Sequence, residues 1–270
     1  MMKRIRTALC LILAAALLAG CAFLPGESEP EALVPADPLT GHPLEWPGQR
    51  PVAVTIENST ASATQWGISS ASVVLEALTE AGMATELCLV YPALAATPKV
   101  GPVAAGQDIY WRLLVGQQPL SVQRGGGQFD QNYLDYYSIR AVDALEAGRT
   151  AFDCGSEWSN APLWYTSGSA VSKVLDALSI SAVLTESRVT SAASAAAASA
   201  SSGSDAVLTV PALLPQEEDG KLPDATAPDA VNIRVCFDDN NATGFAYDPD
   251  SGLYRMLHAD GTPQLDANNG

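Results

Sequence analysis

Basic residues and histidine are scarce in this sequence. It has 14 lysines and arginines against 30 aspartates and glutamates, which gives a formal net charge of −16 at pH 7. So acidic a surface repels nucleic-acid phosphates, and we expect no nucleic-acid partner. The two histidines, His42 and His258, lie in different parts of the chain, and Gly-x-Ser-x-Gly, Walker and dinucleotide-binding patterns are absent. No catalytic triad and no nucleotide cofactor are therefore indicated.

Cysteine is also rare, with 5 in the whole chain. Cys88, Cys154 and Cys236 show neither Cys-x-x-Cys nor the spacing of zinc ligands, so no metal site is expected. Cys88 lies in an apolar run at 87–90, where a buried free thiol is usual. A disulfide between Cys154 and Cys236 remains an alternative, because an exported protein meets oxidising conditions.

Long apolar runs are absent beyond the N-terminal leader. Basic residues precede an apolar stretch, Ala8–Leu18, which is too short to span a bilayer and ends in Leu-Ala-Gly-Cys at 18–21. This ending resembles the lipobox of bacterial lipoproteins. The resemblance implies that residues 1–20 are a signal peptide, that Cys21 becomes a lipidated N-terminus, and that the chain is anchored to the extracytoplasmic face of the cell membrane. An ordinary secretory signal with a chance cysteine is the alternative.

A segment rich in proline and glutamate follows Cys21. It has little with which to form a core, so we expect residues 21–36 to be an extended, disordered tether. Strand-like and helix-like segments then alternate, which indicates an α/β domain over 37–186 with a mixed, partly parallel sheet. The expected strands are 51–56, 87–91 and 120–122, and the expected helices are 69–80, 107–115, 128–137 and 169–178.

The composition changes at a tract of serine and alanine that begins near residue 191. Together with the acidic, proline-rich sequence after it, this tract predicts a linker or insertion over 187–229. A strand-like segment at 231–237 and two turn sequences then indicate a β-meander over 230–270. We expect a partial β-rich domain that ends before its sheet is complete. Its exposed edge makes a partner-docking module one hypothesis.

The loop Arg124–Gln128 contains three consecutive glycines between an expected strand and an expected helix. Glycines let the backbone approach a ligand closely, and a helix N-terminus favours an anion. Arg124 would add a fixed fork of donors. A tight strand-to-helix turn without a ligand is the alternative that spacing alone leaves open.

Carboxylates suggest a second kind of chemistry. Glu57 ends the first expected strand, where active-site groups of α/β sheets often lie. Glu76 and Glu80 are four residues apart in an expected helix, and an exposed helix face explains them more simply than catalysis does. An envelope hydrolase or transferase that uses Glu57 is therefore an alternative function.

Several short motifs, in their order, are similar to those of the YerB-like lipoproteins of Gram-positive bacteria. They are Asp37–Gly41, Arg50–Val54, Ile56–Ser59, Gln65–Ser69, Lys99–Val103, Gly125–Gly126, Ala161–Pro162, Tyr165–Thr166 and Tyr247–Arg255. They cover most of 37–270 outside the serine- and alanine-rich insertion. The resemblance implies an N-terminal α/β domain and a smaller β-rich C-terminal domain. It implies no activity, because the function of that family is not established.

The chain departs from this family pattern at polar positions. Basic residues of the pattern are replaced by Ala104 and Gln107, an arginine before the second strand is replaced by Thr85–Glu86, and a His-Asn pair is replaced by Leu163–Trp164. These are groups that a ligand site or catalytic site would use. The resemblance therefore predicts a divergent member whose site is altered or lost.

These observations together favour a non-enzymatic, lipid-anchored binding protein of the cell envelope. We expect no cofactor and no metal, and an envelope ligand or protein as partner. The expected ligand-binding residues are Glu57, Asn58, Lys99, Gly101, Arg124, Gly125, Gly126 and Gly127.

Overall fold

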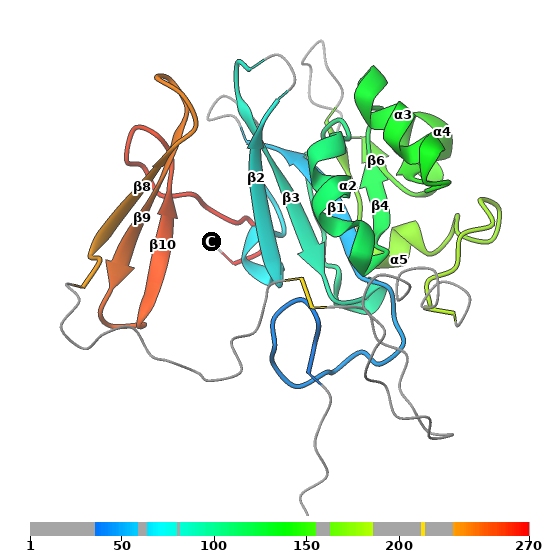
Figure 1. The fold of residues 1–270 in the computed structure, drawn as a ribbon, viewed down its shortest axis with the longest axis horizontal. Coiled ribbons are helices and arrows are strands. Elements are labelled where there is room, and N and C mark those ends of the chain that lie inside the picture. The colour runs from blue at the N-terminus through cyan, green and yellow to red at the C-terminus, as the bar shows by residue number, and fades with distance from the viewer. Residues whose placement is uncertain are drawn as a thin grey trace, which may run out of the picture. The chain divides into compact units, whose positions relative to one another are not determined.

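The computed structural model describes residues 36–58, 64–79, 82–154, 163–185, 212–213 and 229–269 (Figure 1). The expected signal peptide, Cys21, nearly all of the tether and most of the linker lie outside these residues. Within the described ranges, no helix has both the length and the apolar character needed to cross a membrane.

Five strands form one mixed sheet in the order β2-β3-β1-β4-β5. β3 runs antiparallel to both β1 and β2, whereas β1, β4 and β5 are parallel. β1 and β3 lie inside the sheet with both faces covered, so their sequences are almost continuously apolar. The predicted mixed sheet is confirmed. The strands are β1 (Val52–Glu57), β2 (Val73–Leu78), β3 (Thr85–Tyr91), β4 (Leu120–Gln123) and β5 (Val142–Asp143).

Two helices, α2 (Asp108–Leu114) and α3 (Gln128–Tyr136), cover one face of this sheet (Figure 1). They confirm the helices predicted at 107–115 and 128–137, to within one residue at each end. The apolar residues of this face form one core cluster, in which strand and helix side chains interlock. Its buried members are Leu39, Ala53, Cys88, Val90, Tyr110, Trp111, Leu114 and Leu134.

The opposite face of the sheet is covered by α5 (Gly168–Val171) and the turns that follow it to residue 180. The predicted helix at 169–178 is wrong beyond this first part. Hydrogen bonds after α5 mix three-residue and four-residue spacings, so the chain stays compact without forming a regular helix. The core side chains that this segment contributes are Val171, Val174, Leu175, Leu178 and Ile180.

The segment predicted as a helix at 69–80 is instead a short 3-10 helix, η2 (Ile68–Ser70), followed by strand β2, so that prediction is wrong. Val73, Leu75 and Ala77 alternate onto the face that carries α2, which is the period of a strand. The apolar spacing of this segment fits a helix equally well, so its conformation is decided by pairing with β3, which runs along the whole length of β2.

Short elements complete this part of the molecule. Most of them lie in the connections between the longer strands and helices, and β6 and β7 pair as a two-stranded antiparallel sheet. They are η3 (Leu94–Ala96), η4 (Val115–Gln117), α4 (Ala144–Ala147), η5 (Gly148–Thr150), β6 (Asp153–Cys154) and β7 (Trp164–Tyr165).

A separate antiparallel sheet of three strands lies in the C-terminal region (Figure 1). Its strands, in the order β10-β9-β8, are β8 (Asn232–Cys236), β9 (Ala242–Asp248) and β10 (Leu253–Leu257). The predicted β-meander is confirmed. No disulfide joins Cys154 to Cys236, so the bond that the sequence left open does not form.

Candidate functional site

Glu57 and Asn58, two of the predicted site residues, lie at the end of β1 beside the C-terminal segment. Asn58 Nδ2 donates to Glu76 Oε1 at 3.0 Å, and Asn58 Oδ1 accepts a hydrogen bond from Gln264 Nε2 at 3.0 Å. Glu76 Oε1 also accepts from Thr243 Oγ1 of β9, at 2.8 Å. The Asn58 side chain therefore connects the five-stranded sheet to the C-terminal region.

Lys99 and Gly101 lie in the chain between η3 and α2. The Lys99 ammonium group lies 3.8 Å from the centre of the Trp66 ring and 4.9 Å from that of Tyr165, so two aromatic faces hold the cation. Gly101 has a φ of +144°, and a Cβ there would lie 2.8 Å from the Trp164 carbonyl oxygen. Close packing against Trp164 thus explains this glycine without a ligand.

The glycine-rich loop joins β4 to α3 and packs against carboxylates of the protein itself. Gly125 N donates to both carboxylate oxygens of Asp143, at 2.9 and 3.0 Å. A Cβ on Gly126 would overlap the Asp130 carboxylate, which lies against that glycine. These contacts favour the tight-turn interpretation of the loop, because they require glycine whether or not a ligand binds there.

Asp130 lies in the first turn of α3 and is fully buried. Its carboxylate accepts hydrogen bonds from Trp111 Nε1 at 2.5 Å and from Gln123 Nε2 at 2.9 Å. Burial raises the pKa of Asp130, and the hydrogen bonds from Trp111 and Gln123 oppose that rise only in part. This internal carboxylate already lies at the start of the helix, where a bound anion was predicted.

The backbone between residues 99 and 106 connects the predicted positions. Glu57 N donates to Pro102 O at 3.0 Å, Arg124 N donates to Ala104 O at 2.8 Å, and Gly106 N donates to Gly125 O at 2.8 Å. The predicted residues are thereby brought to the carboxyl-end edge of β1 and β4. Their side chains do not make one cluster, because Asn58, Lys99 and the glycines each contact a different set of groups.

A polar cleft lies next to this edge, between α3 and the end of β5, and encloses about 420 Å³. Gln123 and Asp143 enter it from the ends of two parallel strands, which pair directly at these residues. The other polar side chains that line it are Gln131, Asp135, Ser138, Arg140 and Glu146. Sequence reasoning missed this cleft. The sequence signal that could have indicated it is a series of acidic residues near the ends of α3, β5 and α4, namely Asp135, Asp143 and Glu146.

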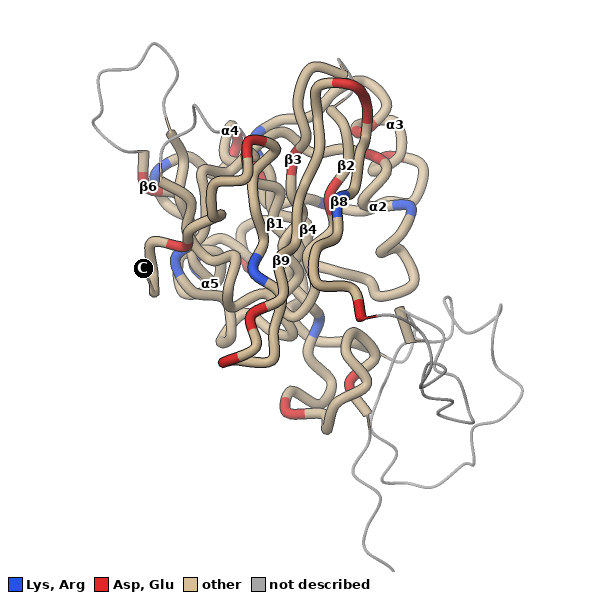
Figure 2. Tube along the Cα trace, turned by 90° about the vertical axis from the view of Figure 1, so that its left-hand side faces the viewer, with Lys and Arg blue, Asp and Glu red and all other residues tan. Residues whose placement is uncertain are grey.

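Each charged side chain of the cleft has a hydrogen-bond partner or an ion-pair partner. Arg140 contacts Glu146 at 3.0 Å, and Gln131 Nε2 donates to Asp135 Oδ1 at 2.9 Å. Both oxygens of Asp143 accept backbone hydrogen bonds. Figure 2 shows acidic positions over both the α/β part and the small sheet, with fewer basic ones between them. Among the described residues, no group of three His, Cys, Asp or Glu could hold a metal ion.

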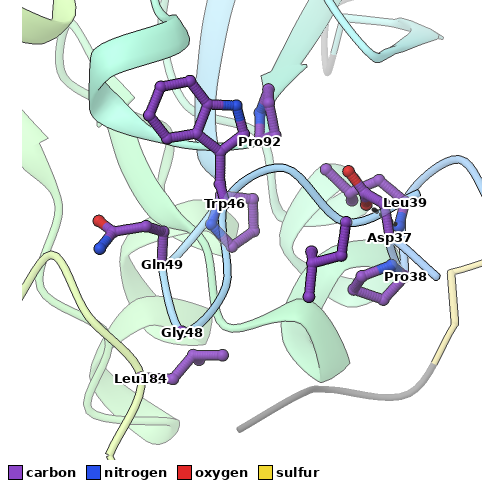
Figure 3. A pocket seen from close by; sticks show the side chains of 10 residues that line it. Asp37, Pro38, Leu39, Trp46, Gly48, Gln49, Pro92 and Leu184 are labelled. Carbon is purple, nitrogen blue, oxygen red and sulfur yellow. Dashed lines mark hydrogen bonds between the residues drawn. The ribbon is translucent and has the colours of Figure 1, made fainter. Parts of the chain in front are cut away.

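A second hollow is apolar and lies under the N-terminal loop of the described chain (Figure 3). It encloses about 30 Å³ and is lined by Leu39, Trp46, Pro92 and Leu184 among others. Room for one or two water molecules and an apolar lining are features of a packing defect. A larger hollow of about 640 Å³ shares Leu39, Trp46 and Pro92 with it. We place the candidate site in the polar cleft because that cleft lies where the parallel strands β4 and β5 end.

Comparison with known proteins agrees with this architecture. A family model described as "Protein of unknown function (DUF3048) N-terminal domain" matches residues 39–181, just over half of the chain. The chain belongs to this family. The crystal structure of the YerB protein from Bacillus subtilis is similar, with a TM-score of 0.65 at 22% identity over 87% of this chain and 70% of that one. At this identity the likeness shows the fold alone, and no curated protein matches.

The predicted resemblance to the YerB-like family is thus confirmed, and two of the departures from its pattern meet in this structure. Gln107 Nε2 donates to Glu86 Oε2 at 2.5 Å, so two of the residues that were predicted to depart from the family pattern contact one another. Thr85 Oγ1 accepts from Asn58 Nδ2 at 2.9 Å. None of these three side chains, Gln107, Glu86 and Thr85, lines the cleft beside β5.

Proposed function

We propose that this member of the family is a lipid-anchored, extracytoplasmic binding protein of the cell envelope, whose ligand enters the cleft between α3 and β5. The position of the cleft carries the proposal, since open α/β sheets bind ligands at the carboxyl ends of parallel strands. Its lining of amide, carboxylate and guanidinium groups, from Gln131 to Glu146, suits a polar ligand. Cys21, in its lipobox-like sequence, supports the anchor.

Binding is favoured over catalysis because the carboxylates around the cleft already have partners. Asp143 is held by the N–H groups of Gly125 and Leu145, and Glu146 is paired with Arg140. A general acid or base must be able to exchange its proton with the substrate, and such engagement opposes that exchange. The same partners hold the oxygens in fixed positions, which favours recognition of hydroxyl and amide groups.

Arg124 and the neighbouring Gly125, two of the ligand-binding residues predicted from the sequence, belong to the proposed site. Arg124 follows Gln123, which lines the cleft, and its Nε atom is buried without a hydrogen-bond partner among the described residues. A bound anion or carbonyl group would supply that missing acceptor.

A thermal-shift screen of cell-wall fragments, sugars and phosphate tests the site. We expect a ligand that stabilises the wild type and loses its effect in Arg140→Ala or Arg124→Ala. Arg255→Ala is the matched control, because Arg255 forms an exposed pair with Asp248 in the small sheet. Equal stabilisation of all these variants, or of none, would place the ligand elsewhere and remove the cleft from the proposal.

The anchor is tested separately, in cells that express the chain. We expect Cys21 to carry a diacylglyceryl group by mass spectrometry of the mature N-terminus, and Cys21→Ala to abolish incorporation of labelled palmitate. Release of a mature protein with an unmodified Cys21 would show an ordinary secretory signal instead. This outcome would leave the cleft proposal intact.

A second candidate function is the envelope hydrolase that uses Glu57. The observation in its favour is that Glu57 lies directly opposite Glu86 in the β1–β3 register, which brings two carboxylates to one face of the sheet. Activity on peptidoglycan that Glu57→Gln abolishes would support it. An inactive wild type would remove it.

A further inference from the structure

Among the described residues, no strand pairs with the outer edge of β8. β8 is an outer strand of the small sheet (Figure 1). All of its residues are exposed. The other outer strand, β10, is partly covered by the chain that follows it, since Leu257 pairs with Pro263 and Gln264 N donates to Met256 O at 2.9 Å. An uncovered edge is a template on which another strand can pair.

The backbone groups on this outer edge belong to Asn232, Arg234 and Cys236. Tyr247 N donates to Val231 O at 2.8 Å, which turns the backbone groups of Val231 and of every second residue after it toward β9. Ile233 opposite Phe245 continues that alternation. The N–H and C=O groups of Asn232 and Arg234 therefore point away from the sheet.

Val231, which precedes β8, and two side chains of β8 make an exposed apolar row. Val231, Ile233 and Val235 share one face and are 58%, 40% and 41% exposed. β8 contains no proline, and Arg234 is its one charged residue. Proline and charge are what usually keep an edge strand from pairing, so this edge is poorly protected.

We propose that β8 pairs with β8 of a second copy of this chain, antiparallel about a two-fold axis at Ile233, and joins two small sheets into one. In this register Ile233 faces its counterpart, Val231 faces Val235, and Asn232 faces Arg234. Apolar residues meet apolar residues, and the single cation meets an amide. The outward backbone groups of Asn232 and Arg234 then exchange both N–H···O bonds in each of the two symmetric pairs.

Alternative registers fit less well. A shift by one residue would set the apolar row of one copy opposite the polar row of the other. A shift by two in one direction places Arg234 directly opposite its counterpart, and like charges at that position destabilise the pair. A shift by two in the other direction sets the apolar Val235 opposite the charged Asp229. Self-complementarity at Ile233 is thus a property of this particular strand, and it identifies a second copy as the occupant. The assembly does not use the cleft and goes beyond the proposed function.

The first test is sedimentation of the purified full chain over a wide range of concentration. We expect a monomer–dimer equilibrium that Ile233→Lys weakens at least about tenfold, because two lysines would meet on the axis. Leu253→Lys makes the same change on β10, where the side chain is 67% exposed, and should leave the equilibrium unchanged. A chain that stays monomeric, or a dimer that Ile233→Lys does not weaken, overturns the proposal.

The second test determines the register by oxidative cross-linking in a Cys154→Ser, Cys236→Ser background. Ile233→Cys should form a disulfide-linked dimer, because opposite residues that share no backbone hydrogen bonds bring their side chains closest. Arg234→Cys should not, because in this register it faces Asn232. Cross-linking through Arg234→Cys in preference to Ile233→Cys would overturn the two-fold axis at Ile233.

Discussion

The first five residues of β1 are buried, whereas every residue of β8 is exposed. The five-stranded sheet has a core on each face, and the helix layer and the α5 segment fill those cores. In the small sheet, Ile233 and Val235 keep about two fifths of their surface open. The α/β part therefore derives its stability from apolar burial, and the small sheet must derive more of its order from specific polar contacts.

Those polar contacts tie the C-terminal region to the α/β part. The Asp266 carboxylate accepts from Gly67 N at 3.0 Å, from Ser69 N at 2.9 Å and from Ser69 Oγ at 2.6 Å. Asn268 Nδ2 donates to Lys99 O at 3.1 Å. A few hydrogen bonds thus help to attach the C-terminal region, whereas the five-stranded sheet is held by a continuous apolar core on each face.

The largest effect should come from opening a cavity in the α/β core. Leu89 is fully buried in β3, and Leu89→Ala should lower the free energy of unfolding by about 2–5 kcal/mol. Ile233→Ala in β8 should cost less than about 1 kcal/mol, since its side chain is already partly solvated. Urea denaturation of both variants measures the contrast. Similar costs would contradict the division between the two regions.

The next effect concerns the packing around the buried carboxylate. Gly126→Ala should cost about 1–3 kcal/mol, because the new methyl group would overlap Asp130, which Trp111 and Gln123 hold in place. Gly116→Ala is the control, because a Cβ at that position meets open space. Thermal unfolding of the two variants gives the comparison, and an equal loss of stability in both would argue against the close packing.

A smaller effect is expected from the contact at Asp266. Asp266→Asn should cost about 1–2 kcal/mol, because the amide cannot satisfy all the donors that the carboxylate satisfies. Burial would raise the pKa of Asp266, but hydrogen bonds from Ser69 and from the N–H groups of Asn268 and Gly67 outweigh it and hold the pKa below the ordinary value of 3.8. Deuterium exchange at Gly67 and Ser69 should also become faster in the variant.

The lowered pKa of Asp266 also predicts how the free energy of unfolding depends on pH. A carboxyl group whose pKa is lower in the folded state stabilises the fold at pH values above its unfolded pKa. That contribution is lost as the pH falls through the folded pKa, below about 3.8. Wild type should therefore lose stability more steeply than Asp266→Asn on acidification. Parallel pH profiles would show that Asp266 does not contribute in this way.

The smallest effect should come from the bond between Thr243 and Glu76. A double-mutant cycle with Thr243→Val and Glu76→Gln should give a coupling free energy of about 0.5–1 kcal/mol, because the bond is only partly buried. Urea unfolding of the four proteins supplies the cycle. Additive effects of the two substitutions would show that the bond adds nothing to the attachment of β9.

The sequence predicts the secondary-structure elements better than it predicts the contacts between residues that are distant in the chain. The mixed sheet, α2, α3 and the β-meander were predictable, because each has an apolar period or turn residues of its own. β2 was not, since Val73, Val74, Ala77 and Leu78 fit a helix until β3 is present beside them. The predicted glycine loop is in place, but the approach of Asp130 to Gly126 depends on how α3 packs against β4.

By itself, the sequence determined the strands that are buried on both faces and the turns of the small sheet, because their signals lie within a few consecutive residues. It is also the sole basis for the prediction of a lipid anchor at Cys21. The tertiary structure alone decided that Asn58 and Lys99 contact different groups, that the polar cleft forms between α3 and β5, and that Asp266 reaches Gly67. Such contacts join residues that are distant in the chain, so no local pattern encodes them.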